Sequence, residues 1–117
     1  MQLKFQLEGD VVAVTTEGKI TQSSIDSSSD PLATLLGPGV YERTVLLNLS
    51  ESDYIDSSGV SWLLGCHKRF NSSGGQLVLH SLSPMIHQTL RVLRMHQVFN
   101  IAPDATSARA LACGGAR

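Results

Sequence analysis

The residues best suited to chemistry in this sequence are four consecutive ones, Asp56, Ser57, Ser58 and Gly59. A serine hydroxyl can accept a phosphate or, beside a base, act as a nucleophile. Asp and Ser are also ordinary N-terminal caps of helices, and most capping serines have no further role. On local chemistry alone, capping is the favoured interpretation of these residues.

The flanking segments place the tetrapeptide between a strand and a helix. Residues 45–49 are apolar apart from Asn48 and do not alternate, which is typical of a strand buried on both faces in a parallel sheet. From Ser58 onward, helical spacing predicts one buried face made of Val60, Leu63, Leu64, His67 and Phe70. Functional sites in open α/β sheets gather where strands end and helices begin. A helix N-terminus accommodates a phosphate, because it offers unpaired N–H groups and the positive end of the helix dipole.

The opposite face of this helix is expected to hold Ser58, Trp62, Gly65 and Arg69. Ser58 and Trp62 are four residues apart and are therefore neighbours on that face. A large aromatic side chain that points away from the sheet, one turn from a modifiable hydroxyl, indicates a protein contact surface. The alternative, in which another helix covers Trp62, has equal weight.

The remaining pattern predicts a single α/β domain over residues 1–117. Alternating Leu3, Phe5 and Leu7 indicate a half-buried strand with one apolar face, paired as a hairpin with residues 11–16. The later elements are a helix from Asp30-Pro31 to Leu36, a strand over 76–80, a helix from Ser83-Pro84 buried through Ile86, Leu90 and Leu93, a strand over 98–101, and a helix from Pro103-Asp104 with Ala108 and Leu111 among its apolar positions. The order is ββαβαβαβα, a mixed sheet of about five strands with about four helices.

Composition restricts the functional classes. The net charge is −1 and the basic residues are scattered, so direct nucleic-acid binding is not expected. No apolar run is long enough to cross a bilayer and no secretory signal is visible, which favours a cytoplasmic protein without a membrane partner. Cys66 and Cys113 are expected to be free thiols. No cofactor or metal is expected, because the carboxylates Glu51, Asp53 and Asp56 are more simply solvated loop residues.

Residues 47–60, Leu-Asn-Leu-Ser-Glu-Ser-Asp-Tyr-Ile-Asp-Ser-Ser-Gly-Val, closely resemble the hallmark segment of STAS domains, in particular that of bacterial anti-sigma factor antagonists. The family pattern is an apolar strand, an aromatic residue, an aliphatic residue and Asp-Ser-Ser/Thr-Gly. The aromatic residue is Tyr54 here. Gly18, Gly74-Gly75 and Ser83-Pro84 also fit, so the resemblance covers nearly the whole chain.

The resemblance implies a STAS fold and a partner-switching module. In such a module the unphosphorylated antagonist binds an anti-sigma factor that is also a serine kinase, and this frees the sigma factor. The kinase uses ATP to phosphorylate the antagonist and ends the binding, and a serine phosphatase restores it. The implied acceptor is Ser57, with Ser58 as second choice, and the implied partner-binding residues are Tyr54, Asp56, Ser57, Ser58, Gly59, Trp62 and Thr21.

Thr21 departs from the family pattern. It stands three positions after Gly18, where members of this group often have an acidic residue. This favours an alternative, a non-switching STAS domain that acts as a scaffold or binds a small ligand, whereas the two serines after Asp56 argue for the switch.

Enzyme activity is not expected. A hydrolase would need Ser57 or Ser58 beside a histidine, and the sequence has no Gly-x-Ser-x-Gly elbow. His67 falls on the buried helix face and is interpreted as a hydrogen-bonded core residue. His80, His87 and His96 match no common zinc spacing.

Overall fold

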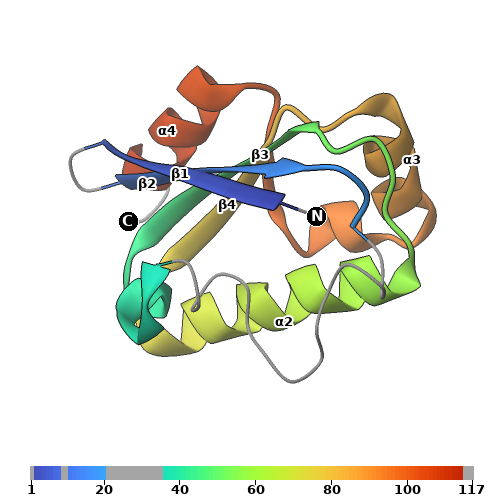
Figure 1. Ribbon diagram of the computed structural model, residues 1–117. Coiled ribbons are helices and arrows are strands. Elements are labelled where there is room, and N and C mark those ends of the chain that lie inside the picture. The colour runs from blue at the N-terminus through green and yellow to red at the C-terminus, as the bar shows by residue number, and fades with distance from the viewer. Residues whose placement is uncertain (1, 9–10, 21–35, 115–117) are drawn as a thin grey trace.

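The computed structural model describes residues 2–8, 11–20 and 36–114 (Figure 1). Its elements in chain order are β1 (Gln2–Glu8), β2 (Val11–Glu17), the 3-10 helix η1 (Pro38–Glu42), β3 (Thr44–Glu51), α2 (Ser57–Ser73), β4 (Gln76–His80), α3 (Pro84–Val92), the 3-10 helix η2 (Met95–Gln97), β5 (Asn100–Ala102) and α4 (Ala105–Gly114). Thr21 and the expected helix from Asp30 lie outside the described residues, apart from Leu36 at its end. The predicted mixed sheet of five strands is confirmed, and the described residues hold three α-helices where about four helices are expected.

The five strands form one sheet in the order β1-β2-β3-β4-β5. β1 runs antiparallel to β2, whereas the β2–β3, β3–β4 and β4–β5 pairs are parallel. The segment β3-α2-β4 is therefore a βαβ unit, as the non-alternating apolar strands predict. Parallel pairing brings the carboxyl ends of β2 to β5 to one edge of the sheet, and the loops at that edge carry the candidate site.

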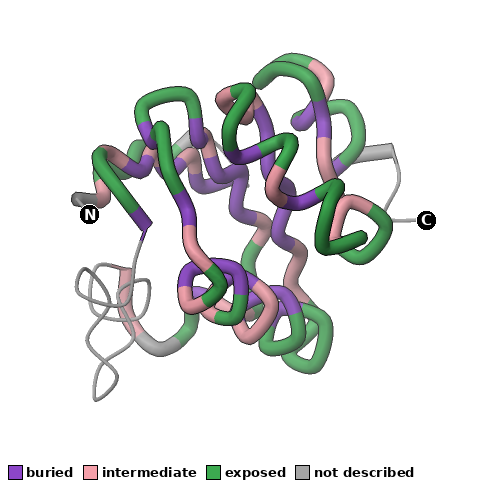
Figure 2. Tube along the Cα trace, turned by 90° about the vertical axis from the view of Figure 1, so that its right-hand side faces the viewer, coloured by how far each residue is buried: buried purple, intermediate pink, exposed green. Residues whose placement is uncertain are grey.

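Helices cover both faces of the sheet (Figure 1). α2 lies along one face, where the main core joins Val14, Leu47 and Leu79 of the strands to Leu63 and Phe70 of the helix. A smaller core on the other face places Ala108 and Ala112 of α4 against strand residues such as Leu46 and Val78. Buried residues gather in the central strands and along one side of α2 (Figure 2). Burial on both faces explains why the central strands are apolar without alternation.

The ends of α2 follow from its sequence. Asp56 precedes it as N-cap, and Gly74 follows it in the left-handed conformation, with φ of 88° and its N–H bonded to the Phe70 carbonyl. The helix begins at Ser57, one residue before the predicted start. Its buried residues include Gly59 and Cys66 beside the expected Val60, Leu63, His67 and Phe70, while Leu64 is only half-buried.

Several burial predictions are wrong at the periphery of the fold. Phe5 and Leu7 are 47% and 58% exposed, although β1 itself is present. Leu93 is also exposed, because α3 ends at Val92. In α4 the expected apolar position Ala108 is buried together with Ala112, whereas Leu111 is exposed. The last strand begins at Asn100 and not at Val98, because the N–H groups of Val98 and Phe99 bond to the Met95 carbonyl at the end of the 3-10 helix η2. None of the helices among the described residues combines the length and apolarity needed to span a bilayer.

Candidate functional site

The site lies at the loop between β3 and α2, at the carboxyl edge of the parallel strands. Ser57 is the first residue of α2 and is exposed, whereas Ser58 is half-buried and Gly59 is buried. A reagent that approaches from solvent therefore reaches the Ser57 side chain more readily than that of Ser58. This difference follows from helix geometry, because successive residues point about 100° apart around the axis.

The Asp56 side chain caps the helix and fixes the start of α2. Its Oδ1 accepts a hydrogen bond of 2.9 Å from the Gly59 backbone N–H, and its backbone carbonyl accepts from the Val60 N–H at 3.0 Å. The first bond satisfies a donor of the first turn that has no intrahelical partner, and the second is the first i→i−4 bond of the helix. The aspartate of the tetrapeptide thus acts as a cap, and the adjacent Ser57 is presented from a fixed backbone.

Ile20 holds this loop from the other side. Its N–H donates to the Tyr54 carbonyl at 2.9 Å, its carbonyl accepts from the Asp56 N–H at 3.2 Å, and it forms an isolated parallel bridge with Ile55. Gly59 packs directly on this segment, because a Cβ at position 59 would overlap the Ile20 carbonyl oxygen and the Ile55 side chain. The glycine of the tetrapeptide is therefore required by close backbone approach.

A second link joins β2 to the same loop. The hydroxyl groups of Thr16 and Ser52 are 2.5 Å apart, and both residues are fully buried. Ser52 is the first residue after β3, so this hydrogen bond fixes the loop where it leaves the sheet. Buried hydroxyls are stable only when paired, so neither residue can be lost without leaving the other unsatisfied.

Trp62 is neither fully exposed, as a contact surface would require, nor fully covered, as packing under another helix would require. Its side chain is half-buried and packs against the main core, and its indole nitrogen is buried without a hydrogen-bond partner. Ser58 and Gly65 on the same side of α2 are half-buried, and Arg69 is exposed with its guanidinium over the Tyr41 ring. Trp62 is therefore partly a core residue, with only part of its ring open to a partner.

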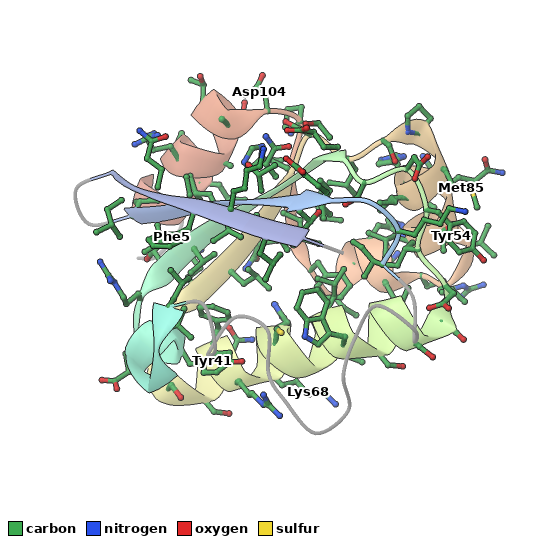
Figure 3. The ribbon with its side chains drawn as sticks, in the orientation of Figure 1. Phe5, Tyr41, Tyr54, Lys68, Met85 and Asp104 are labelled. Carbon is green, nitrogen blue, oxygen red and sulfur yellow. The ribbon has the colours of Figure 1, made fainter. Side chains whose placement is uncertain are left out.

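Tyr54 and Met85 lie at the same end of the molecule as the start of α2 (Figure 3). Both side chains are exposed, at 38% and 44%. Asp53 in the same loop is exposed and Asp56 is half-buried, so the loop that leads to Ser57 carries two carboxylates and an exposed aromatic residue. Glu51 ends β3 and pairs with Glu17 of β2. The described residues contain no group of three or more His, Cys, Asp or Glu side chains arranged to hold a metal ion.

Two of the four histidines, His67 and His80, are engaged in contacts with residues other than the serines of the site. His67 lies on the buried side of α2, where its Nε2 is 3.2 Å from the Asn71 amide and its ring packs edge-on against Phe99. His80 at the end of β4 is buried, with Nδ1 2.9 Å from the Ser81 hydroxyl. Burial lowers the pKa of both imidazoles, and for His80 the nearby Asp104 carboxylate opposes this in part. The core interpretation of His67 is confirmed.

Sequence reasoning missed the residues that hold the loop in place, namely Ile20, Thr16 and Ser52. Ile20 is a single apolar residue between Lys19 and a polar stretch, which gives no periodic signal. Thr16 and Ser52 are 36 residues apart and belong to a strand end and a polar connection. Only the parallel pairing of β2 with β3, which sets their ends side by side, brings these hydroxyls together.

Comparison with known proteins places this architecture in a family. The family model described as the STAS domain matches residues 2–108. The chain is 26% identical over 106 residues to the anti-sigma F factor antagonist of Paenibacillus polymyxa, with 88% of this chain and 85% of that protein covered. The chain therefore belongs to the STAS domain family.

Solved structures agree at the level of the fold. The anti-sigma factor antagonist SpoIIAA in its unphosphorylated form superposes with a TM-score of 0.65 at 22% identity, covering 94% of each chain. The phosphorylated form of SpoIIAA, a cell fate determinant of Bacillus, superposes with a TM-score of 0.62 at 15% identity, covering 88% of this chain and 93% of that one. At these identities the likeness establishes the fold.

Proposed function

We propose that this protein is an anti-sigma factor antagonist of a partner-switching pathway and that Ser57 is its phosphorylation site. The observation that carries the proposal is the exposed Ser57 hydroxyl at the first position of α2, beside the capping Asp56. The name of the relative from Paenibacillus polymyxa supports the class of protein. The two solved forms of SpoIIAA support regulation by phosphate in a protein of this fold.

In this proposal the unphosphorylated protein binds an anti-sigma factor that is also a serine kinase, and so frees the sigma factor. The docking surface includes Tyr54, Ser57, Ser58 and the exposed part of Trp62; Thr21, which the sequence also suggests for partner binding, lies outside the described residues. A serine phosphatase restores the binding form. The protein is the substrate of these enzymes, not a catalyst, and it acts in the cytoplasm without contacting DNA.

The switch works by charge and bulk at a preformed site. A phosphate on Ser57 adds about two negative charges to a loop that already carries Asp53 and Asp56. The N-terminus of α2 tolerates this group, because the helix dipole is positive there, so the helix stays folded. Burying the phosphate against a partner without a matching cation is costly, and we expect affinity to fall by about two orders of magnitude or more.

Binding measurements with two variants of Ser57 test the switch. Ser57→Ala should bind the anti-sigma kinase persistently in the presence of ATP, because it cannot accept phosphate. Ser57→Asp should bind weakly, since it places a charge at the same point of the surface. Equal affinity of the two variants for the kinase would contradict the charge mechanism and favour a non-switching scaffold or ligand-binding domain.

A further inference from the structure

The apolar face of the sheet continues outward onto the edge strand β1. Phe5 lies opposite Val14 and Leu7 opposite Val12, and both valines are fully buried in the main core. Directly opposed residues share one face of a sheet, so Phe5 and Leu7 extend the surface that α2 covers further in. They are nevertheless 47% and 58% exposed (Figure 3 marks Phe5). Among the described residues, only β2 pairs with this strand.

This edge carries one of the usual protections against pairing with another chain, the charged side chain of Lys4, and lacks the others. Edge strands are normally kept short, or they carry lysine or other charged side chains, proline, a bulge or a charge that faces the apolar side. β1 has seven residues, its register with β2 is continuous and it contains no proline. Lys4 is the one charged residue within 3–7, and it points to the other face, where it forms an ion pair with Glu17. The opposite edge, β5, has only three residues.

We propose that a second copy of this chain pairs with β1 in antiparallel orientation about a two-fold axis at Phe5, which makes a continuous ten-stranded sheet. In this register Phe5 faces Phe5 of the other copy, Leu3 faces Leu7, and Lys4 faces the uncharged Gln6. No like charges meet between residues 3 and 7, and the apolar side chains of both copies fall on one face. Such an interface uses the same patch on both copies and closes as a dimer.

The two-fold axis stands perpendicular to the sheet, which decides how the dimer presents its other surfaces. The α2 layers of both copies lie on the same side of the sheet. The carboxyl edges of the parallel strands point in opposite directions, so the two Ser57 residues lie at opposite ends of the dimer. Each copy therefore offers its loop after β3 independently, and a partner that binds there should assemble as two partners on one dimer.

Sedimentation velocity over a wide protein concentration range tests the dimer. The wild-type chain should show a concentration-dependent monomer–dimer equilibrium. Phe5→Glu places two carboxylates opposite each other on the axis and should weaken dimerisation at least about tenfold. The matched control is Gln6→Glu, which adds the same charge to the same strand but opposite Lys4, and it should dimerise at least as well as the wild type. A wild-type chain that stays monomeric throughout would overturn the proposal.

Hydrogen exchange of the wild-type protein gives a readout without substitution. Among residues 3–7, the amides that point away from β2 should become more protected as concentration rises, while those of β5 should not change. A dimer whose β1 amides show no added protection, or whose affinity is the same in Phe5→Glu and Gln6→Glu, would show that the copies meet elsewhere and would refute the β1 interface.

Discussion

At the scale of single residues, the two adjacent serines of the hallmark segment differ in exposure. Ser57 is exposed and Ser58 is half-buried, although both precede the buried Gly59 in the same helix turn. Asp56 is engaged with the Gly59 N–H as a cap. In this segment Asp56 therefore fixes the start of the helix and Ser57 is exposed to solvent. Gly59 allows the backbone of Ile20 to approach.

Gly59 should not tolerate even a methyl group. Gly59→Ala drives a Cβ into the Ile20 carbonyl oxygen and the Ile55 side chain, and the required backbone shift should lower the free energy of unfolding by about 1–3 kcal/mol. Gly65→Ala in the same helix is the control, because a Cβ there meets no atom within 4 Å. Its gain in helix propensity should leave stability unchanged or raise it by up to about 1 kcal/mol. Urea unfolding measures the free energy of unfolding of both variants. An equal change in Gly59→Ala and Gly65→Ala would contradict the close contact between Gly59 and Ile20.

At the scale of elements, the fold holds the loop after β3 by joining it to the end of β2. Two connections do this, the buried Thr16–Ser52 hydrogen bond and the Ile20 bridge to Ile55. Both depend on the parallel pairing of β2 with β3, which shifts register between Thr15 and Glu17, near these contacts. The segment after β2 and the segment before α2 therefore form one unit, and a change in one should be transmitted to the other.

The Thr16–Ser52 pair should show strong coupling in a double-mutant cycle. Ser52→Ala leaves the buried Thr16 hydroxyl without its partner, so we expect a loss of about 1–3 kcal/mol in unfolding free energy. Adding Thr16→Val removes the stranded hydroxyl and should recover about 1 kcal/mol or more of that loss. Denaturant unfolding of the four proteins measures the coupling. Purely additive losses would mean that the two hydroxyls do not depend on each other.

Most strands and helices could be predicted from the sequence, because apolar periodicity and the residues that begin and end helices are local features of the chain. The strand over 76–80 was predicted with its observed bounds, since it is apolar and follows the helix stop at Gly74. The Ser83 cap before Pro84 was equally clear. The exposure of Phe5 and Leu7 could not be predicted, because alternation shows which residues share a face but not what covers that face. The contact of Ile20 with Ile55 and Gly59 could not be predicted either, because it depends on how the strands pair in three dimensions.

At the scale of the whole molecule, two buried histidines should make stability depend on pH. Burial lowers the pKa of His67 and of His80 below the usual 6.5, so between the folded and unfolded pKa values the unfolded chain binds more protons. The free energy of unfolding should therefore be fully retained above pH 6.5 and should fall as the pH drops below it. Urea unfolding at neutral and mildly acidic pH measures this dependence.

Substitution separates the contribution of these histidines from general acid effects. His67→Gln should lower stability at neutral pH but flatten the fall on acidification, because the side chain can no longer take up a proton. His87→Gln is the matched control, since His87 is exposed on α3, and it should leave the slope unchanged. A slope that is identical in wild type, His67→Gln and the control would show that burial of His67 does not govern the pH response.

The central claim is that Ser57 is the phosphate acceptor of a partner switch, and intact mass measurement tests it most directly. The protein is incubated with ATP, magnesium and its cognate serine kinase, and the products are mapped by peptide mass spectrometry, with Ser57→Ala and Ser58→Ala treated in parallel. We expect one added phosphate on Ser57 in the wild type and in Ser58→Ala, and none in Ser57→Ala. Absence of phosphate on the wild type with an active kinase, or its undiminished uptake by Ser57→Ala, would contradict the account.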